Sequence, residues 1–201
     1  MKMLSPFLES NRLEAGCDEV GRGCLCGPVV AAAVILPESF ANELVNDSKK
    51  LKKQDRTALV TEIKLEAIAW AVAEASVEEI DQINILNASF LAMNRAVQAL
   101  QTQPEHLLID GNRFKTTLNI PFDCIIKGDG KYASIAAASI LAKVYRDEMM
   151  AELAEQFPGY GWEKNVGYPT KAHRDGIRKH GLTPLHRKTF KHLPEQLKME
   201  F

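Results

Sequence analysis

The sequence predicts an α/β protein in which five short strands form a mixed sheet flanked by helices. Five short apolar runs lie between segments whose apolar residues recur at helical spacing. The chain has 201 residues, 46% of them hydrophobic, which is enough to bury a core as one domain with an appendage. We therefore expect a body at 1–161 and a basic helical appendage at 162–201 that packs on it.

Five ranges are predicted as strands. Residues 13–20 and 29–36 are apolar or β-branched runs on either side of a glycine-rich stretch, so we expect them to pair. Residues 68–75 alternate in polarity and complete an antiparallel meander. Residues 106–109 and 122–126 are short apolar runs, and an aspartate followed by glycine comes soon after each. The carboxyl ends of strands are where open α/β sheets usually bind ligands.

The helices are predicted from the spacing of apolar residues. Apolar residues at every fourth position from Leu59 to Ala67 indicate a helix with one buried face. A short helix at 78–83 and a longer one from about 85 to 101 follow. The alanine-rich range 134–157 is predicted as a long helix whose small side chains let it approach the sheet closely.

The appendage is basic and begins after a Pro-Gly break at 158–161. Thr170 is an N-cap candidate for a helix that ends at Gly181, and Thr183-Pro184 is predicted to start another. Residues 162–201 contain nine Lys or Arg against four Asp or Glu, a net +5, whereas 1–161 carry −6. This asymmetry indicates that the appendage meets a polyanion and that the body holds acids for metal ions, although a solvated helical face also explains charge runs.

The chain shows neither a signal-peptide run nor an apolar segment long enough to span a membrane, so we expect a cytoplasmic protein with no membrane partner. Its four cysteines are too few and too clustered for a disulfide framework. We expect them to be free thiols.

Four acids follow or end predicted strands, and together they indicate a metal site: Asp18, Glu19, Asp110 and Asp129. Clustered carboxylates repel one another, and a divalent cation removes that repulsion. Hard oxygen ligands select Mg²⁺ or Mn²⁺. Taken singly, Asp110 and Asp129 are also typical turn-forming acids before glycine, and Asp18 and Glu19 share a face only if the strand bends.

The glycine-rich stretch at 16–28 mixes acids and an arginine among four glycines. Glycine lets a backbone approach another molecule closely, so the stretch indicates a contact surface. An exposed turn between two strands is the alternative.

Six motifs in the same order resemble bacterial ribonuclease HII, and the resemblance spans nearly the whole chain. They are residues 18–23 (DEVGRG), 46–51 (NDSKKL), 109–112 (IDGN), 127–129 (KGD), 137–143 (AASILAK) and 167–170 (GYPT). The resemblance implies the ribonuclease H-like fold, a five-stranded mixed sheet with helices on both faces and a C-terminal helical appendage.

The resemblance also implies an endonuclease that cuts the RNA strand of RNA/DNA hybrids and nicks 5′ of single ribonucleotides embedded in duplex DNA. The products would carry 3′-hydroxyl and 5′-phosphate ends. By motif position, Asp18, Glu19, Asp110 and Asp129 resemble the catalytic carboxylates that hold two metal ions, one activating a water and the other stabilising the leaving oxygen.

Further residues resemble the family's substrate contacts. Gly21, Arg22 and Gly23 match the loop that senses the 2′-hydroxyl, and Tyr168 matches the tyrosine that packs on the following deoxyribose. The candidates for backbone phosphates are Ser48, Lys49, Lys50, Lys127 and Lys143, with ordinary surface residues as the alternative. A clamp on the duplex is expected from Lys171, Arg174, Arg187 and Lys188.

Cys24 and Cys26 stand where the family commonly has proline and a small residue. We expect small apolar fillers, with a redox effect on the loop as the alternative. Asp147 lies on the inward side of the long helix, and we expect an ion-pair or helix-packing role there rather than a metal ligand. The histidines of the appendage resemble a metal cluster only in number, and their basic neighbours indicate a nucleic-acid face: His173, His180, His186 and His192.

Two other function classes remain open from the sequence. One is another ribonuclease H-like nuclease of the junction-resolvase type, which needs no 2′-hydroxyl. The other is a non-catalytic module that binds hybrids. The segment 196–201 resembles a sliding-clamp-binding peptide but lacks the paired aromatics, so we interpret it as a helix end, although binding to a sliding clamp stays possible. We also expect the protein to be a monomer.

Overall fold

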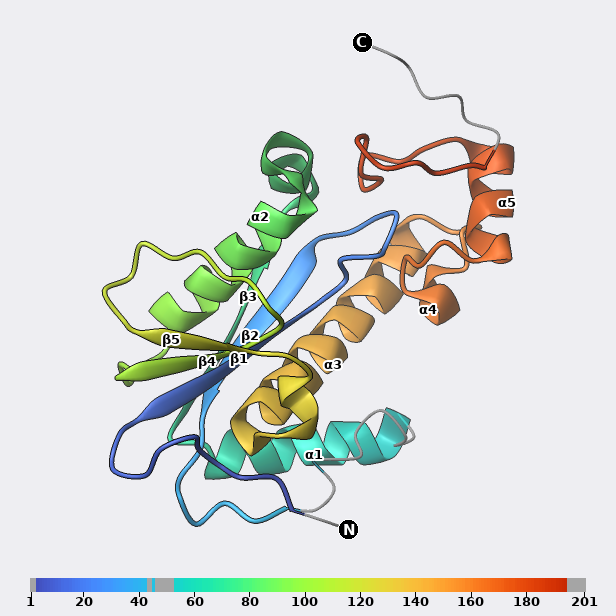
Figure 1. Cartoon of the computed structure of the whole chain (residues 1–201). Coiled ribbons are helices and arrows are strands. Elements are labelled where there is room, and N and C mark those ends of the chain that lie inside the picture. The colour runs from blue at the N-terminus through green and yellow to red at the C-terminus, as the bar shows by residue number, and fades with distance from the viewer. Residues whose placement is uncertain (1–2, 43–44, 46–52, 195–201) are drawn as a thin grey trace.

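The computed structural model describes residues 3–42, 45 and 53–194, and within them the chain forms a five-stranded sheet between two layers of helices (Figure 1). The strands are β1 (Glu14–Val20), β2 (Val29–Ile35), β3 (Ala69–Ala75), β4 (His106–Asp110) and β5 (Phe122–Ile125). Their order in the sheet is β3-β2-β1-β4-β5. β1, β2 and β3 pair antiparallel, whereas β4 runs parallel to β1 and β5 parallel to β4. The predicted strands and the mixed sheet are confirmed.

Helices cover both faces of the sheet. The helix α2 (Val77–Gln98) packs on one face against Ala31, Ala33 and their neighbours, and α1 (Lys53–Glu66) and α3 (Ala133–Gln156) cover the other. Within α2, Asn84 has a φ of 66° and separates two helical stretches, as the sequence predicts. None of the helices in the described part of the chain is long and apolar enough to cross a membrane.

The long helix α3 lies very close to β1. A Cβ atom at Gly16 of β1 would come within 2.2 Å of the Ser134 carbonyl carbon, so only glycine fits there. The facing side of α3 is formed largely by buried alanines, which confirms the predicted close approach. The contact brings the middle of α3 beside the carboxyl end of β1.

The C-terminal segment packs on the end of α3 and on the loop between β1 and β2. It contains α4 (Trp162–Asn165) and α5 (Lys171–His180), and a cluster built around Trp162, Cys26 and Met150 joins it to the body. The Thr170 hydroxyl accepts from the His173 amide, so the predicted N-cap is confirmed. The helix predicted to start at 183–184 is wrong: the Thr183 hydroxyl contacts the His186 ring and accepts from the Leu185 amide, which closes a turn there.

Candidate active site

A hollow of about 390 Å³ opens at the carboxyl ends of β1 and β4. Its lining comes from β1, β4, α1, α3, a 3₁₀ turn and the loop before α5: Asp18, Glu19, Val20, Arg56, Asp110, Asp129, Ser139, Ile140, Lys143 and Tyr168. Since β1 and β4 are parallel and Cys17 is in register with Ile109, the next residues, Asp18 and Asp110, occupy neighbouring positions. The structure thus brings all four predicted carboxylates to one cavity.

Two of these carboxylates are buried without enough compensating charge. Burial, followed by the Glu19 and Asp110 charges, raises the pKa of Asp18 well above its usual value, against the opposing hydrogen bond from Ser139. Burial also raises the pKa of Glu19, although the Arg22 guanidinium 3.1 Å away opposes this. The site therefore resists holding its full negative charge unless a cation joins it.

Three of the four carboxylates, those of Asp18, Glu19 and Asp110, accept a hydrogen bond from the chain. Asp18 Oδ1 accepts from the Glu19 amide at 2.7 Å, and Asp110 Oδ1 accepts from the Gly128 amide at 2.7 Å. Among the described residues, no three His, Cys, Asp or Glu side chains are arranged to hold a metal ion as they stand. Their chemistry nevertheless fits a hard divalent cation, because the set offers carboxylate oxygens whose burial disfavours the charged form.

Cationic side chains line the same hollow. Lys143 pairs with Asp147 one turn further along α3, and Arg56 Nη1 lies 4.0 Å from the other oxygen of that carboxylate. This confirms the ion-pair role expected for Asp147. Arg56 could not be recognised from the sequence, because one arginine at the start of a helix after a lysine-rich loop carries no distinguishing pattern.

The loop between β1 and β2 lies next to the hollow, because it contacts Tyr168, which lines it. Gly21 has a φ of +98°, and Gly23 faces Tyr168, whose ring would lie 3.8 Å from a Cβ placed at that glycine. Tyr168 is 39% exposed and lines the hollow, and burial, followed by the neighbouring Cys24, raises its pKa. The predicted sugar-sensing loop and the predicted tyrosine are thus neighbours.

Arg187 does not belong to a phosphate clamp, and that expectation is wrong. Its side chain is fully buried, and its guanidinium donates hydrogen bonds to backbone carbonyls of the loop between β1 and β2. Lys171 is exposed and pairs with Asp175 at 2.6 Å, and Lys127 is exposed just before Gly128. Residues 48–50 lie outside the described residues.

Three of the four appendage histidines form part of the interior, so the nucleic-acid face expected for them is also wrong. His173, His186 and His192 are at most 2% exposed. Trp162 Nε1 donates to His173 Nε2 at 2.9 Å, and burial lowers the pKa of His173 and brings that of His186 to about 4. These rings are neutral packing groups beneath Tyr168, whose carbonyl lies 3.0 Å from His173 Nδ1.

The two unusual cysteines are interior residues. Cys24 and Cys26 are free thiols with no exposed surface. Burial raises the pKa of Cys24 and that of Cys26 to about 12, so the reactive thiolate is disfavoured. The expected role as small fillers fits the structure.

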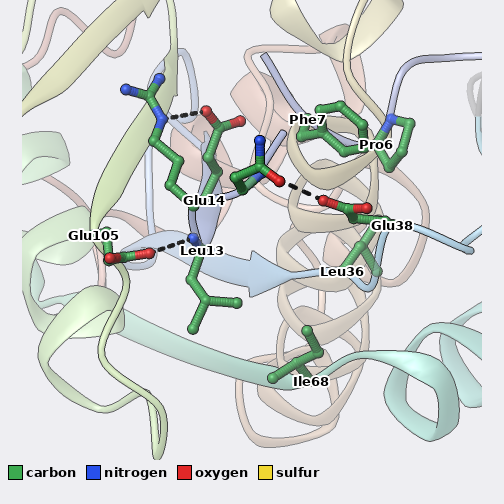
Figure 2. A pocket seen from close by; sticks show the side chains of 10 residues that line it. Pro6, Phe7, Leu13, Glu14, Leu36, Glu38, Ile68 and Glu105 are labelled. Atoms are coloured by element: carbon green, nitrogen blue, oxygen red, sulfur yellow. Dashed lines mark hydrogen bonds and ion pairs between the residues drawn. The ribbon is translucent and has the colours of Figure 1, made fainter. Parts of the chain in front are cut away.

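A second acid-lined hollow, of about 280 Å³, lies at the other end of β1 (Figure 2). Glu14 accepts from the Leu8 and Glu9 amides and from Arg12 Nε. Glu105 accepts from the Leu13 amide, a contact drawn as a dashed line in Figure 2, and Glu38 accepts from the Asn11 amide. These carboxylates hold residues 8–13 in place.

A family model described as ribonuclease HII matches residues 15–193. The chain belongs to the ribonuclease HII family. The ribonuclease HII of Parabacteroides distasonis is 63% identical over 199 residues, covering 99% of this chain and 100% of the relative. That of Bacteroides thetaiotaomicron is 61% identical, with 99% and 100% covered. This ribonuclease HII is therefore a hydrolase of the ribonuclease H type, a metal-dependent endonuclease that acts on RNA/DNA hybrids.

Solved structures agree on the fold. The ribonuclease H2 of Pyrococcus horikoshii aligns with a TM-score of 0.74 at 25% identity, covering 89% of this chain and 94% of that chain. The ribonuclease HII in a PCNA complex from Archaeoglobus fulgidus aligns with a TM-score of 0.74 at 26% identity, covering 94% of this chain and 100% of that chain. The expected ribonuclease H-like fold is thereby confirmed.

Proposed function

We propose that this ribonuclease HII also nicks duplex DNA on the 5′ side of a single embedded ribonucleotide, leaving 3′-hydroxyl and 5′-phosphate ends. The observation that carries the proposal is the position of Tyr168 between the loop 21–23 and the acids of the cavity. Tyr168 lines the cavity that contains the acids, and Gly23 of the loop 21–23 faces Tyr168. A loop with glycines at both sides of Arg22 allows its backbone to approach a ribose and test for the 2′-hydroxyl.

Asp18, Glu19, Asp110 and Asp129 would hold Mg²⁺ or Mn²⁺. The bound ions supply an activated water and stabilise the charge that develops on the leaving oxygen. The carboxylates of the chain orient the ions, while Arg22 limits the freedom of Glu19 through their 3.1 Å ion pair. Lys143 and Arg56 face the same cavity and offer positive charge to the phosphates beside the cut.

Sugar and phosphate recognition are separate in this proposal. Tyr168 offers an exposed ring face to the deoxyribose that follows the ribonucleotide. Lys49, Lys50, Lys127 and Lys171 would contact the backbone without sequence preference, which makes binding salt-dependent. Ser48 would add a neutral phosphate contact.

The deciding experiment is a cleavage assay on a DNA duplex that carries one ribonucleotide, with Mg²⁺ or Mn²⁺. We expect one nick 5′ of the ribonucleotide, no cleavage without metal and none of the matched all-DNA duplex. Equal cleavage of the all-DNA duplex would instead favour a resolvase-type nuclease. A long RNA/DNA hybrid measured in parallel, in each metal, gives the substrate and metal preferences.

A non-catalytic hybrid-binding role is tested by Asp18→Asn. The proposal expects this variant to bind the ribonucleotide duplex and not to cut it. Cleavage at the wild-type rate would remove the metal assignment of Asp18.

We further propose that the protein is a monomer that works in the cytoplasm and meets a sliding clamp. The Archaeoglobus fulgidus relative was solved in a complex with PCNA, which makes a clamp the partner to test. Residues 196–201, the segment with a faint similarity to clamp-binding peptides, lie outside the described residues. Sedimentation with and without a bacterial clamp should give 22.4 kDa alone and a larger species in the mixture.

A further inference from the structure

The loop between β1 and β2 is held from beneath by a residue that lies far away in the sequence. Figure 1 shows this loop reaching toward the C-terminal segment, which supplies Arg187. The guanidinium of Arg187 donates to the carbonyls of Gly21, Arg22, Cys24, Gly27 and Pro28 at 2.7–3.3 Å. Its own amide donates to the Leu25 carbonyl at 2.9 Å.

A second buried arginine completes this support. Arg146 of α3 donates to the carbonyls of Cys26 and Pro28, and also to that of Val166 in the segment before Tyr168. Every carbonyl from residue 21 to 28, except that of Gly23, therefore accepts a hydrogen bond from one of these two arginines. Within the described residues, every acceptor of either guanidinium is a carbonyl and none is a carboxylate.

These hydrogen bonds point the carbonyl groups of the loop inward, toward the two arginines. With the carbonyls drawn inward, the tip at 21–24 closes as a turn in which the Cys24 amide donates to the Gly21 carbonyl at 3.3 Å. Among the described residues, the Arg22 and Gly23 amides at the tip donate no hydrogen bond. A Cβ at Gly21 would lie 2.3 Å from Arg146 Nε, so the Arg146 side chain packs directly against that glycine.

We propose that Arg187 is a positioning residue for ribose recognition: it holds the loop carbonyls inward so that the tip of the loop faces the sugar, and it does not touch the nucleic acid. The proposal rests on the ribonucleotide-nicking function proposed above. The guanidinium of Arg187 reaches five carbonyls at once because it is a planar fork of donors. In an Arg187→Lys variant a single ammonium group cannot replace all of these contacts, so the tip of the loop becomes free to turn. Because Arg187 is fully buried, its guanidinium does not reach the backbone phosphates of the nucleic acid.

The test compares Arg187→Lys with the wild type in two binding measurements made in Ca²⁺, where cleavage is suppressed. The first is the ratio of dissociation constants for the all-DNA duplex and the single-ribonucleotide duplex. We expect the preference for the ribonucleotide to fall about tenfold, the effect of losing one or two hydrogen bonds of ordinary strength. This ratio is unaffected by the folded fraction, so a merely structural role would not change it.

The second measurement is the dependence of log Kd on log salt concentration. A lost phosphate contact reduces that slope by about 0.9, whereas the positioning role leaves it unchanged. The matched control is Lys191→Ala, an exposed cation four residues later, which should keep the ribonucleotide preference. An unchanged preference in Arg187→Lys, or a slope reduced by about one unit, overturns the inference.

A milder variant covers the case in which Arg187→Lys does not fold. The Phe190 ring lies 5.0 Å from the Arg187 guanidinium carbon, so Phe190→Leu loosens the guanidinium without removing it. We expect a smaller loss of preference and an unchanged salt slope, and full retention of the preference overturns the inference. A wild-type protein that neither prefers nor cuts the ribonucleotide duplex overturns the proposed function instead.

Discussion

The two ends of β1 carry acids in opposite situations. At the beginning of the strand, the buried Glu14 carboxylate accepts two backbone amides and the Arg12 guanidinium. Four residues later, burial and like charges raise the pKa of Asp18, and its neighbour Glu19 shows the same direction. Both ends contain a hollow of several hundred Å³ lined by acids.

The difference separates structural acids from functional ones. An acid whose charge is balanced by backbone amides and an arginine, as for Glu14, stabilises the fold. An acid that is buried beside other acids destabilises the fold and binds a cation strongly. Cavity size and residue type alone do not distinguish these two hollows, whereas the charges beside the most buried acid do: Arg12 beside Glu14, and Glu19 and Asp110 beside Asp18.

The largest effect is expected from Asp18→Asn. Cleavage should fall by at least about 1,000-fold, since one carboxylate of the metal set is lost, while the free energy of unfolding rises by on the order of 1 kcal/mol. Single-turnover cleavage and thermal unfolding measure the two quantities. Glu38→Gln at the other hollow is the control and should change neither, because that exposed carboxylate makes one long contact of 3.4 Å. Lower stability of Asp18→Asn would contradict the comparison.

Glu14→Gln should have the reverse signature. Loss of the charge that holds two amides and Arg12 should cost about 3 kcal/mol, the usual worth of hydrogen bonds to a buried charged group. For a chain of this size the melting temperature should fall by about 6–12 °C. Cleavage per folded molecule should remain at the wild-type level, and a drop of tenfold or more at a temperature where the variant is folded would refute the separation of the two ends.

Divalent metal should stabilise the protein only through the acids at the carboxyl end of β1. At a concentration 100 times its dissociation constant, Mg²⁺ or Mn²⁺ should raise the free energy of unfolding by about 2.7 kcal/mol. Thermal scans of the wild type and of Glu14→Gln should show the same increase, and Asp18→Asn should show little. An increase of equal size in Asp18→Asn would place the metal elsewhere.

The smallest effect concerns pH without metal. Because the folded protein raises the pKa values of Asp18 and Glu19, it binds protons more tightly than the unfolded chain. The resulting stability is present below the ordinary carboxyl pKa of about 4 and is lost as pH rises through the raised values. Urea unfolding from pH 4 to 8 should therefore show a steeper fall in the wild type than in Asp18→Asn, by on the order of 1 kcal/mol. Identical slopes would mean that the acids are not strained.

The strands and the four acids could be predicted because their signals are local. Apolar runs indicate β1 and β4. An acid at or next to the end of each run lies where the carboxyl ends of the strands meet, and this placement depends little on distant parts of the chain. The Asn84 interruption and the Thr170 cap are local in the same way.

Arg187 and the histidines could not be predicted, because burial of a polar residue depends on distant partners. Arg187 donates a hydrogen bond to the carbonyl of Arg22, 165 positions earlier, and the sequence around residue 187 does not predict that contact. Basic neighbours made His173 look like a surface residue, although the ring points into the cluster around Trp162. Arg56 was missed for the opposite reason, since it resembles every other surface cation near it.

The span between the loop and Arg187 also determines when the enzyme matures during synthesis. The ribosome makes the loop 21–28 long before the arginine that orders its carbonyls, since Arg187 follows Arg22 by 165 positions. Domains fold as they leave the ribosome, N-terminal parts first, and contacts that span the sequence form last. The nascent sheet can thus hold its acids before the loop 21–28 is set, so under the proposed function the selectivity for ribose arises only after residue 187 has been made.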